Sequence, residues 1–126
     1  MALRLTTSYL EDSLSLFRYY KNLAERAMAQ VTDDQLLAVL DSEGNSIAII
    51  VKHMTGNMRS RWTDFLTTDG EKPGRNRDNE FVDPPPTRAA LLADWENGWA
   101  LVFGALASLT DADLPRRVTK IGRAHV

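Results

Sequence analysis

Hydrophobic residues recur at three-to-four-residue spacing in three stretches of the chain, and this pattern predicts three amphipathic helices. The first helix is predicted over residues 7–31. Its apolar positions form two neighbouring rows, Leu10, Phe17, Ala24 and Val31 beside Leu14 and Met28. Ser8 is a suitable N-cap, and Glu11 follows it at the spacing of a capping box.

The second and third helices are predicted over residues 46–66 and 87–109, with Ser46 (or Asn45) and Thr87 as N-caps. One broad face of the second helix carries Ile47, Ile50, Val51, Met54, Met58, Trp62, Phe65 and Leu66. The third helix has a regular stripe of Leu92, Trp95, Trp99, Val102, Leu106 and Leu109. A short helix is also predicted between the first two, over residues 33–39.

Residues 67–87 show no periodicity and contain Gly70, Pro73, Gly74 and the triple proline 84–86. They predict a loop between the second and third long helices. Loops of this length in a compact domain are usually functional or disordered. Phe81 and Val82 favour an ordered loop, because they can anchor it to the core.

With no convincing strand, the sequence predicts an all-α fold in one domain spanning residues 1–126. Three wide apolar faces suit a three-helix bundle or three quarters of a four-helix bundle. The net charge of −2 gives no case for nucleic acid or an anionic membrane, and the longest apolar run, residues 47–51, is too short to span one. The chain has no cysteine, which leaves the redox compartment undecided. It has no recognisable signal peptide, so we expect a cytoplasmic protein.

His53 is the residue in the second helix that packing alone does not explain. On a helical wheel it lies in a stripe with Ile50, Asn57 and Asp64, at the border of the apolar face. A neutral imidazole can ligate a metal or act as a general base. The alternative is a half-buried histidine with one hydrogen bond, and the residues alone favour it, because the chain has no second histidine or carboxylate at ligand spacing.

Two further groups of residues each have two interpretations, one as a binding site and one as part of the folded structure. Trp62, Trp95 and Trp99 are either an aromatic binding wall or core residues, and their place in the apolar stripes favours the core. Arg75 and Arg77 can bind a carboxylate or phosphate. Asp78 and Glu80 lie beside them, so internal ion pairs are the alternative.

The segments SYLEDSLSLFRYYKNLAERA, SIAIIVKHMTGNMRSRWTDFLTTDGEK, RNRDNEF and LLADWENGWALVFGALASL together resemble a bacterial branch of the DinB-like superfamily with no assigned function. The resemblance covers nearly the whole chain in order. It implies an up-down-down-up four-helix bundle, often dimeric. Many members hold one divalent metal, zinc or nickel, with three histidines, and His53 matches the ligand from the second helix. In that role Asn57 would help to orient the ring. Relatives of known chemistry act with thiols on small molecules.

The sequence departs from this pattern at its end. The fourth helix and its two histidines, in a motif like HYxxHxGQ, have no counterpart, so we expect the chain to be C-terminally incomplete. His125 matches a histidine that precedes that helix. The ending IGRAHV also matches a translation of a sequencing-adapter DNA, which leaves a native and an artefactual origin open.

Two functional interpretations follow. The first is a divalent-metal-dependent, thiol-using transferase or hydrolase that is inactive as this chain, which would bind metal only weakly through His53. The second is a non-catalytic helical module. An uncovered apolar groove would then collapse, cause aggregation, or pair with a second copy in a homodimer. The substrate is left undetermined.

Overall fold

The computed structural model describes residues 3, 6 and 8–118, and every regular element in this part of the chain is a helix. The three long helices are α1 (Tyr9–Ala29), α3 (Ile47–Trp62) and α4 (Arg88–Ala107). The shorter elements are α2 (Asp33–Leu37) and the 3-10 turns η1 (Asp78–Phe81) and η2 (Asp111–Asp113). The predicted all-α fold is therefore confirmed. None of the described helices is long and apolar enough to cross a membrane.

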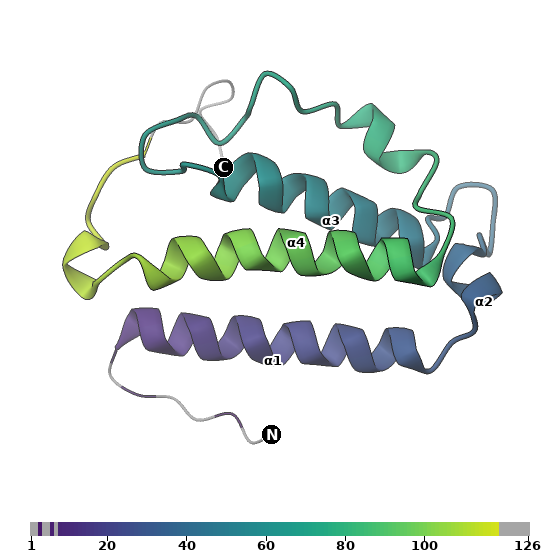
Figure 1. Cartoon of the computed structure of the whole chain (residues 1–126), viewed down its shortest axis with the longest axis horizontal. Coiled ribbons are helices and arrows are strands. Elements are labelled where there is room, and N and C mark those ends of the chain that lie inside the picture. Colours follow the sequence, from purple (N-terminus) through teal and green to yellow (C-terminus); the bar gives the residue numbers. More distant parts are fainter. Residues whose placement is uncertain (1–2, 4–5, 7, 119–126) are drawn as a thin grey trace.

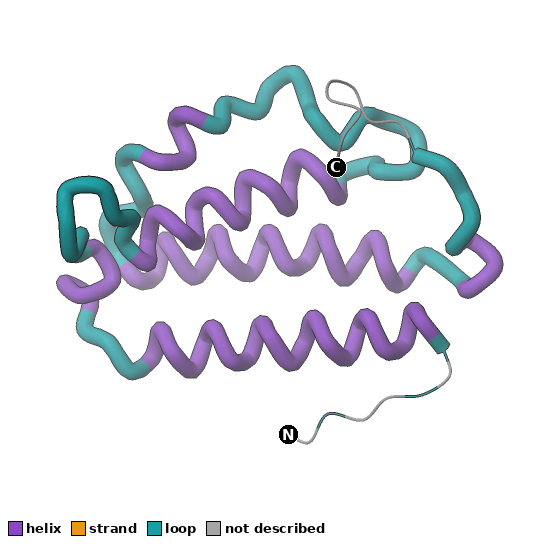
Figure 2. Tube along the Cα trace, turned by 180° about the vertical axis from the view of Figure 1, so that it is seen from behind, coloured by secondary structure: helices purple, strands orange, loops and turns teal. Residues whose placement is uncertain are grey.

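The long helices lie side by side, with α4 between α1 and α3 (Figures 1 and 2). Figure 1 shows that α3 and α4 run in the same direction, opposite to α1. Two neighbouring helices can be parallel only if the chain between them travels back along the bundle. Residues 63–87 do this, running along the outer side of α3 with η1 in their second half (Figure 1).

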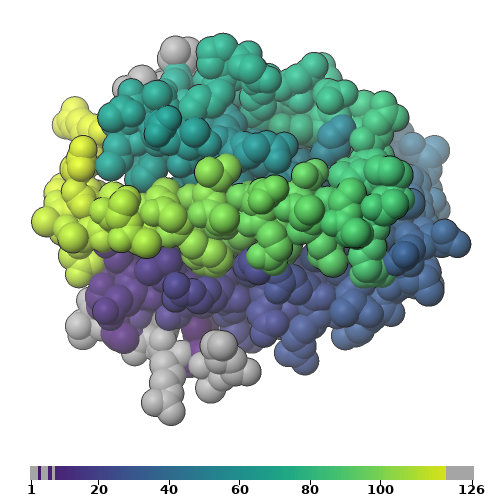
Figure 3. Space-filling model, viewed as in Figure 1, coloured from purple at the N-terminus to yellow at the C-terminus, as the bar shows by residue number. Residues whose placement is uncertain are grey.

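The central position of α4 explains why it carries most of the core. Its buried residues are Leu91, Trp95, Gly98, Trp99, Val102 and Leu106. In Figure 3 its side chains form a continuous band between those of α1 and those of α3 with its loop. Trp95 and Trp99 are 1% and 5% exposed, which confirms their prediction as core residues.

A close approach of α3 and α4 depends on Gly98. A Cβ atom at this position would lie 2.9 Å from Sδ of Met58 and 3.4 Å from Cγ2 of Thr55. A side chain here would force the Met58 side chain to shift, because the packed core leaves little free volume beside it.

The predicted helix starts are confirmed by their caps. The side chains of Ser8, Ser46 and Thr87 each accept a hydrogen bond from the backbone N–H three residues later. A side chain at the start of α4, Arg88, holds the end of α1. The Arg88 guanidinium donates to the backbone oxygens of Met28 (2.9 Å) and Val31 (2.5 Å), in the last turn of α1 and just after it.

Two details of the second predicted helix were wrong. It ends at Trp62 rather than at residue 66, because Thr63 is extended and Asp64 has a positive φ of 48°. Ile50 was expected in the core but is 48% exposed, while its neighbour Ile49 is buried. The predicted first residue of α1, Thr7, and the C-terminal tail with His125 and IGRAHV lie outside the described residues.

Candidate functional site

The loop of residues 63–87 is fastened to α3 by polar contacts. Lys52 donates to the backbone oxygens of Asn79 (2.7 Å) and Val82 (2.6 Å). At the other end of α3, the Ser60 hydroxyl donates to the backbone oxygen of Gly70 (2.6 Å). Phe81 and Val82 are 44% and 50% exposed, so they do not enter the core as predicted, although the Phe81 ring packs on His53 of α3. The loop is ordered through hydrogen bonds and one buried carboxylate instead.

That carboxylate is Glu80, which lies directly over Gly56 of α3. A Cβ atom at position 56 would come within 2.2 Å of Oε2 of Glu80, so only glycine leaves room for this side chain. Arg75 pairs with the same carboxylate through Nε (2.9 Å) and Nη2 (3.1 Å). The two side chains are only 4% and 8% exposed, so the ion pair is buried and both charges are compensated.

His53 completes this arrangement on the other side of Glu80. Its Nδ1 lies 2.9 Å from Oε1 of Glu80, and its ring stacks on Phe81 with centroids 5.0 Å apart. Burial raises the pKa of the Glu80 carboxyl, but hydrogen bonds from Arg75 and His53 outweigh burial and hold the pKa below its usual range. An ionised carboxylate can only accept, so Nδ1 of His53 carries the proton. In the neutral ring the lone pair is then on Nε2.

His53 also lines a groove of about 240 Å³ bounded by α1, α3 and α4. The remaining lining residues are mostly apolar or aromatic: Phe17, Met54, Asn57, Met58, Trp62, Trp99 and Val102. The buried Nε1 of Trp99 has no hydrogen-bond partner among the described residues. The groove therefore combines an apolar wall with a few polar groups, as small-molecule sites do.

Asn57 lies in this groove one turn after His53, but no hydrogen bond joins the two side chains in the described structure. Glu80, rather than Asn57, orients the imidazole ring. The sequence places Glu80 far from His53, so helical spacing gives no sign of the pair. The available signal was Gly56, a small residue in mid-helix that leaves room for a side chain from elsewhere.

The two arginines predicted as a ligand-binding loop both make ion pairs within the chain. Arg75 pairs with Glu80, and Arg77 pairs with Glu71, which also accepts from Arg61 (2.6 Å). The hydrogen bond from Arg77, with the charges of the nearby arginines, holds the pKa of the Glu71 carboxyl below its usual range. Of the two sequence-based alternatives, internal pairing is the arrangement present.

Of the three-histidine metal site that the resemblance implies, this structure contains one ligand position, His53. Among the described residues, no group of three or more histidine or carboxylate side chains is placed to hold a metal ion. The His53–Glu80 pair does have the arrangement that orients metal-ligating histidines, in which the second ring nitrogen donates to a carboxylate. The described residues thus provide one oriented imidazole and not a complete metal site.

Comparison with known proteins places the chain in a family. No curated protein and no solved structure is significantly similar to it. A family model described as "Protein of unknown function (DUF1572)" matches residues 4–126, nearly the whole length. The chain therefore belongs to the DUF1572 family of proteins of unknown function.

Proposed function

We propose that this protein is a DinB-like helical-bundle protein whose groove beside His53 is a divalent-metal-dependent small-molecule site. The sequence resemblance supports this proposal, and so do the directions of the long helices. α1, α3 and α4 run up, down and down, in the order that the resemblance implies for the first three helices (Figure 1). The apolar lining of the groove suits an organic substrate.

The His53–Glu80 pair is the observation that carries the proposal. Here the 2.9 Å contact to Glu80 keeps the proton on Nδ1, which leaves Nε2 as the nitrogen able to bind a metal. The arrangement also keeps a negative charge next to the ring, which would strengthen the imidazole as a ligand.

The number of available ligands limits how tightly residues 8–118 alone can bind a metal. Tight zinc sites use at least three protein ligands, and the described residues supply a single imidazole. The remaining ligands of a complete site would come from outside these residues. We therefore expect this chain by itself to bind a divalent metal weakly, and we assign no reaction step to it.

Titration with paramagnetic Ni²⁺, followed by amide NMR signals, tests this proposal. We expect weak, chelator-reversible broadening of signals around the groove, centred on His53 and including Met54, Asn57 and Trp99. The broadening should disappear in His53→Ala and persist in His125→Ala, which controls for the other histidine. Broadening that survives His53→Ala, or lies elsewhere, would refute the metal role of His53. Stoichiometric metal retained through a chelating wash would contradict weak binding.

A second candidate is self-association through the same groove. Its apolar residues Phe17, Met54 and Trp62 are only half-buried in the single chain, so a second copy would gain stability by covering them. Sedimentation of the wild type and of Met54→Lys would decide this. A concentration-dependent dimer that the variant abolishes supports the candidate, and a wild-type monomer at all concentrations excludes it.

A further inference from the structure

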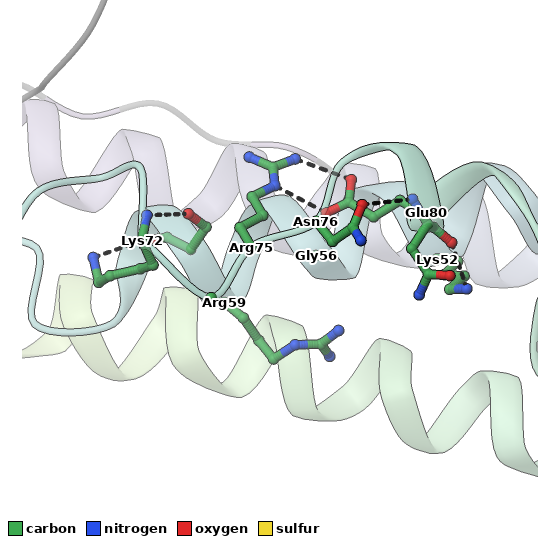
Figure 4. A pocket seen from close by; sticks show the side chains of 10 residues that line it. Lys52, Gly56, Arg59, Lys72, Arg75, Asn76 and Glu80 are labelled. Atoms are coloured by element: carbon green, nitrogen blue, oxygen red, sulfur yellow. Dashed lines mark hydrogen bonds and ion pairs between the residues drawn. The ribbon is translucent and has the colours of Figure 1, made fainter.

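A second concave site lies on the outer side of α3, between that helix and the returning loop, and is separate from the His53 groove. Its volume is about 310 Å³. The residues that line it are Lys52, Gly56, Arg59, Ser60, Lys72, Gly74, Arg75, Asn76, Asn79 and Glu80. Figure 4 shows how these residues lie around the pocket. Of the two arginines predicted to bind a ligand, Arg75 lines this pocket and Arg77 is not among its lining residues. The other cationic residues of the pocket are Lys52 and Arg59 from α3 and Lys72 from the loop.

The charge of this pocket is strongly unbalanced. Four cationic side chains line it, and Glu80 is its one carboxylate. Glu80 compensates Arg75, as described above. Among the described residues, Lys52 and Lys72 donate only to backbone carbonyl oxygens, Lys52 to residues 79, 82 and 83 and Lys72 to residues 60 and 69. These carbonyl groups satisfy the ammonium hydrogens but do not neutralise their charge.

Arg59 adds a third uncompensated cation. Within the part of the chain that the structure describes, its guanidinium has no hydrogen-bond or ion-pair partner. In Figure 4 the Arg75 guanidinium is turned toward Glu80, while the Arg59 side chain extends from α3 with no dashed line to a neighbour. Arg59 can therefore turn onto a ligand without breaking a hydrogen bond or ion pair to any described residue.

Two side-chain amides provide further donors at the same place. Asn76 accepts the backbone N–H of Asn79 through Oδ1 (3.0 Å), which leaves its Nδ2 hydrogens available. The side-chain amide of Asn79 makes no hydrogen bond to the described residues. The pocket thus offers unused N–H donors from Arg59, Asn76 and Asn79 in a field set by Lys52 and Lys72.

The geometry points to this pocket as a binding site for a phosphate group carried by a small molecule. A dianion suits a site with several uncompensated cations better than a single carboxylate does, and arginine with neighbouring amides is a usual set of phosphate donors. The volume is at the lower end for ligand sites, which fits a phosphate with a small organic body. A nucleic acid is disfavoured, because the whole chain has a net charge of −2.

Titration of the whole chain with inorganic phosphate at constant ionic strength, followed by amide NMR signals, tests this site. Chloride replaces phosphate in a parallel titration, because salt screens surface charges without binding specifically. We expect saturable shifts of Lys52, Gly56, Asn76 and Asn79 with phosphate only. Glycerol phosphate should bind at least as tightly as inorganic phosphate, because the proposed ligand is a phosphate carried by a small molecule. Weaker binding of glycerol phosphate would show that the site takes the free ion instead.

Two variants and one control separate this site from a general charge effect. Arg59→Gln should weaken phosphate binding on the order of tenfold, the effect of losing one charge-assisted hydrogen bond. Gly74→Asp adds a carboxylate where a Cβ atom meets nothing within 4 Å, and should also weaken it. Arg26→Gln removes the same charge from an exposed position on α1 and should leave binding unchanged. Absence of saturable shifts, or equal weakening in Arg59→Gln and Arg26→Gln, would overturn the proposal.

Discussion

Oε1 of Glu80 lies 2.9 Å from Nδ1 of His53, although the two residues are 27 positions apart in the chain. This contact links the position of the loop to the proton on the imidazole ring. If the loop moves away, Glu80 leaves Nδ1, and the preference for one tautomer is lost. The order of the loop and the chemistry of His53 are therefore expected to change together.

The first prediction concerns Gly56, which makes room for Glu80. In Gly56→Ala the added methyl group would overlap the Glu80 carboxylate, whose Oε2 lies 2.2 Å from the Cβ position. We expect the free energy of unfolding to fall by about 1–3 kcal/mol, the usual cost of overpacking. Chemical denaturation measures this change. Faster hydrogen exchange of residues 70–83 would show that the loss comes from the loop.

Gly104→Ala is the matched control, since Gly104 also lies within a helix but has no atom within 4 Å of its Cβ position. Alanine there should leave stability unchanged or raise it by up to about 1 kcal/mol, because helical glycine carries an entropic cost. Equal stability changes in the two variants would show that Gly56 is not specifically required.

The second prediction uses the lowered pKa of Glu71, which results from its hydrogen bond to Arg77 and the charges of the neighbouring arginines. A carboxyl with a lower pKa in the folded state stabilises the fold above its ordinary value of 4.5, and this contribution is lost as the pH falls through the folded-state pKa. Glu71→Gln should therefore be less stable than the wild type at pH 7, by up to about 1 kcal/mol.

Denaturation curves of the wild type and Glu71→Gln should converge as the pH falls below 4.5, since Glu71 is then protonated in the wild type as well. Glu43→Gln removes the same charge from an exposed position and should follow the wild type at every pH. A constant difference between wild type and Glu71→Gln down to low pH would contradict the ion-pair explanation.

The helices were predictable because their cause is local. The seven-residue rows from Leu10 to Val31 and the stripe through Trp95 and Trp99 follow from helical periodicity, and the caps Ser8, Ser46 and Thr87 mark their starts. The end of α3 was not predictable in this way. Phe65 and Leu66 continue the apolar pattern, but the backbone turns at Asp64 with a positive φ that the pattern does not contain.

The candidate site was predicted only in part, because its contacts join distant segments. His53 stood out from its neighbours on α3, but its partner Glu80 belongs to a loop without periodicity. A charged residue such as Glu80 is normally expected at the surface, and its burial depends on Arg75 on one side and Gly56 beneath it. Local patterns do not contain this three-way arrangement.

The third prediction concerns Arg88, which holds the end of α1. Its guanidinium donates to Met28, Val31 and the carboxylate of Asp33, the last at 2.6 Å. Arg88→Ala leaves the two backbone oxygens without these donors, and we expect a loss of about 1–3 kcal/mol of stability. Arg26→Ala, at an exposed position in the last turn of α1, should change stability by less than about 0.5 kcal/mol. Thermal or chemical unfolding of both variants measures the difference.

The tautomer of His53 decides whether Nε2 is free to bind a metal. It can be read from the nitrogen chemical shifts and long-range couplings of the ¹⁵N-labelled imidazole ring, at a pH where the ring is neutral. His53→Ala identifies which signals belong to His53 rather than His125. The account predicts the proton on Nδ1, donated to Glu80, with Nε2 unprotonated. A ring with the proton predominantly on Nε2 would contradict it, because the nitrogen proposed as the metal ligand would then carry no lone pair.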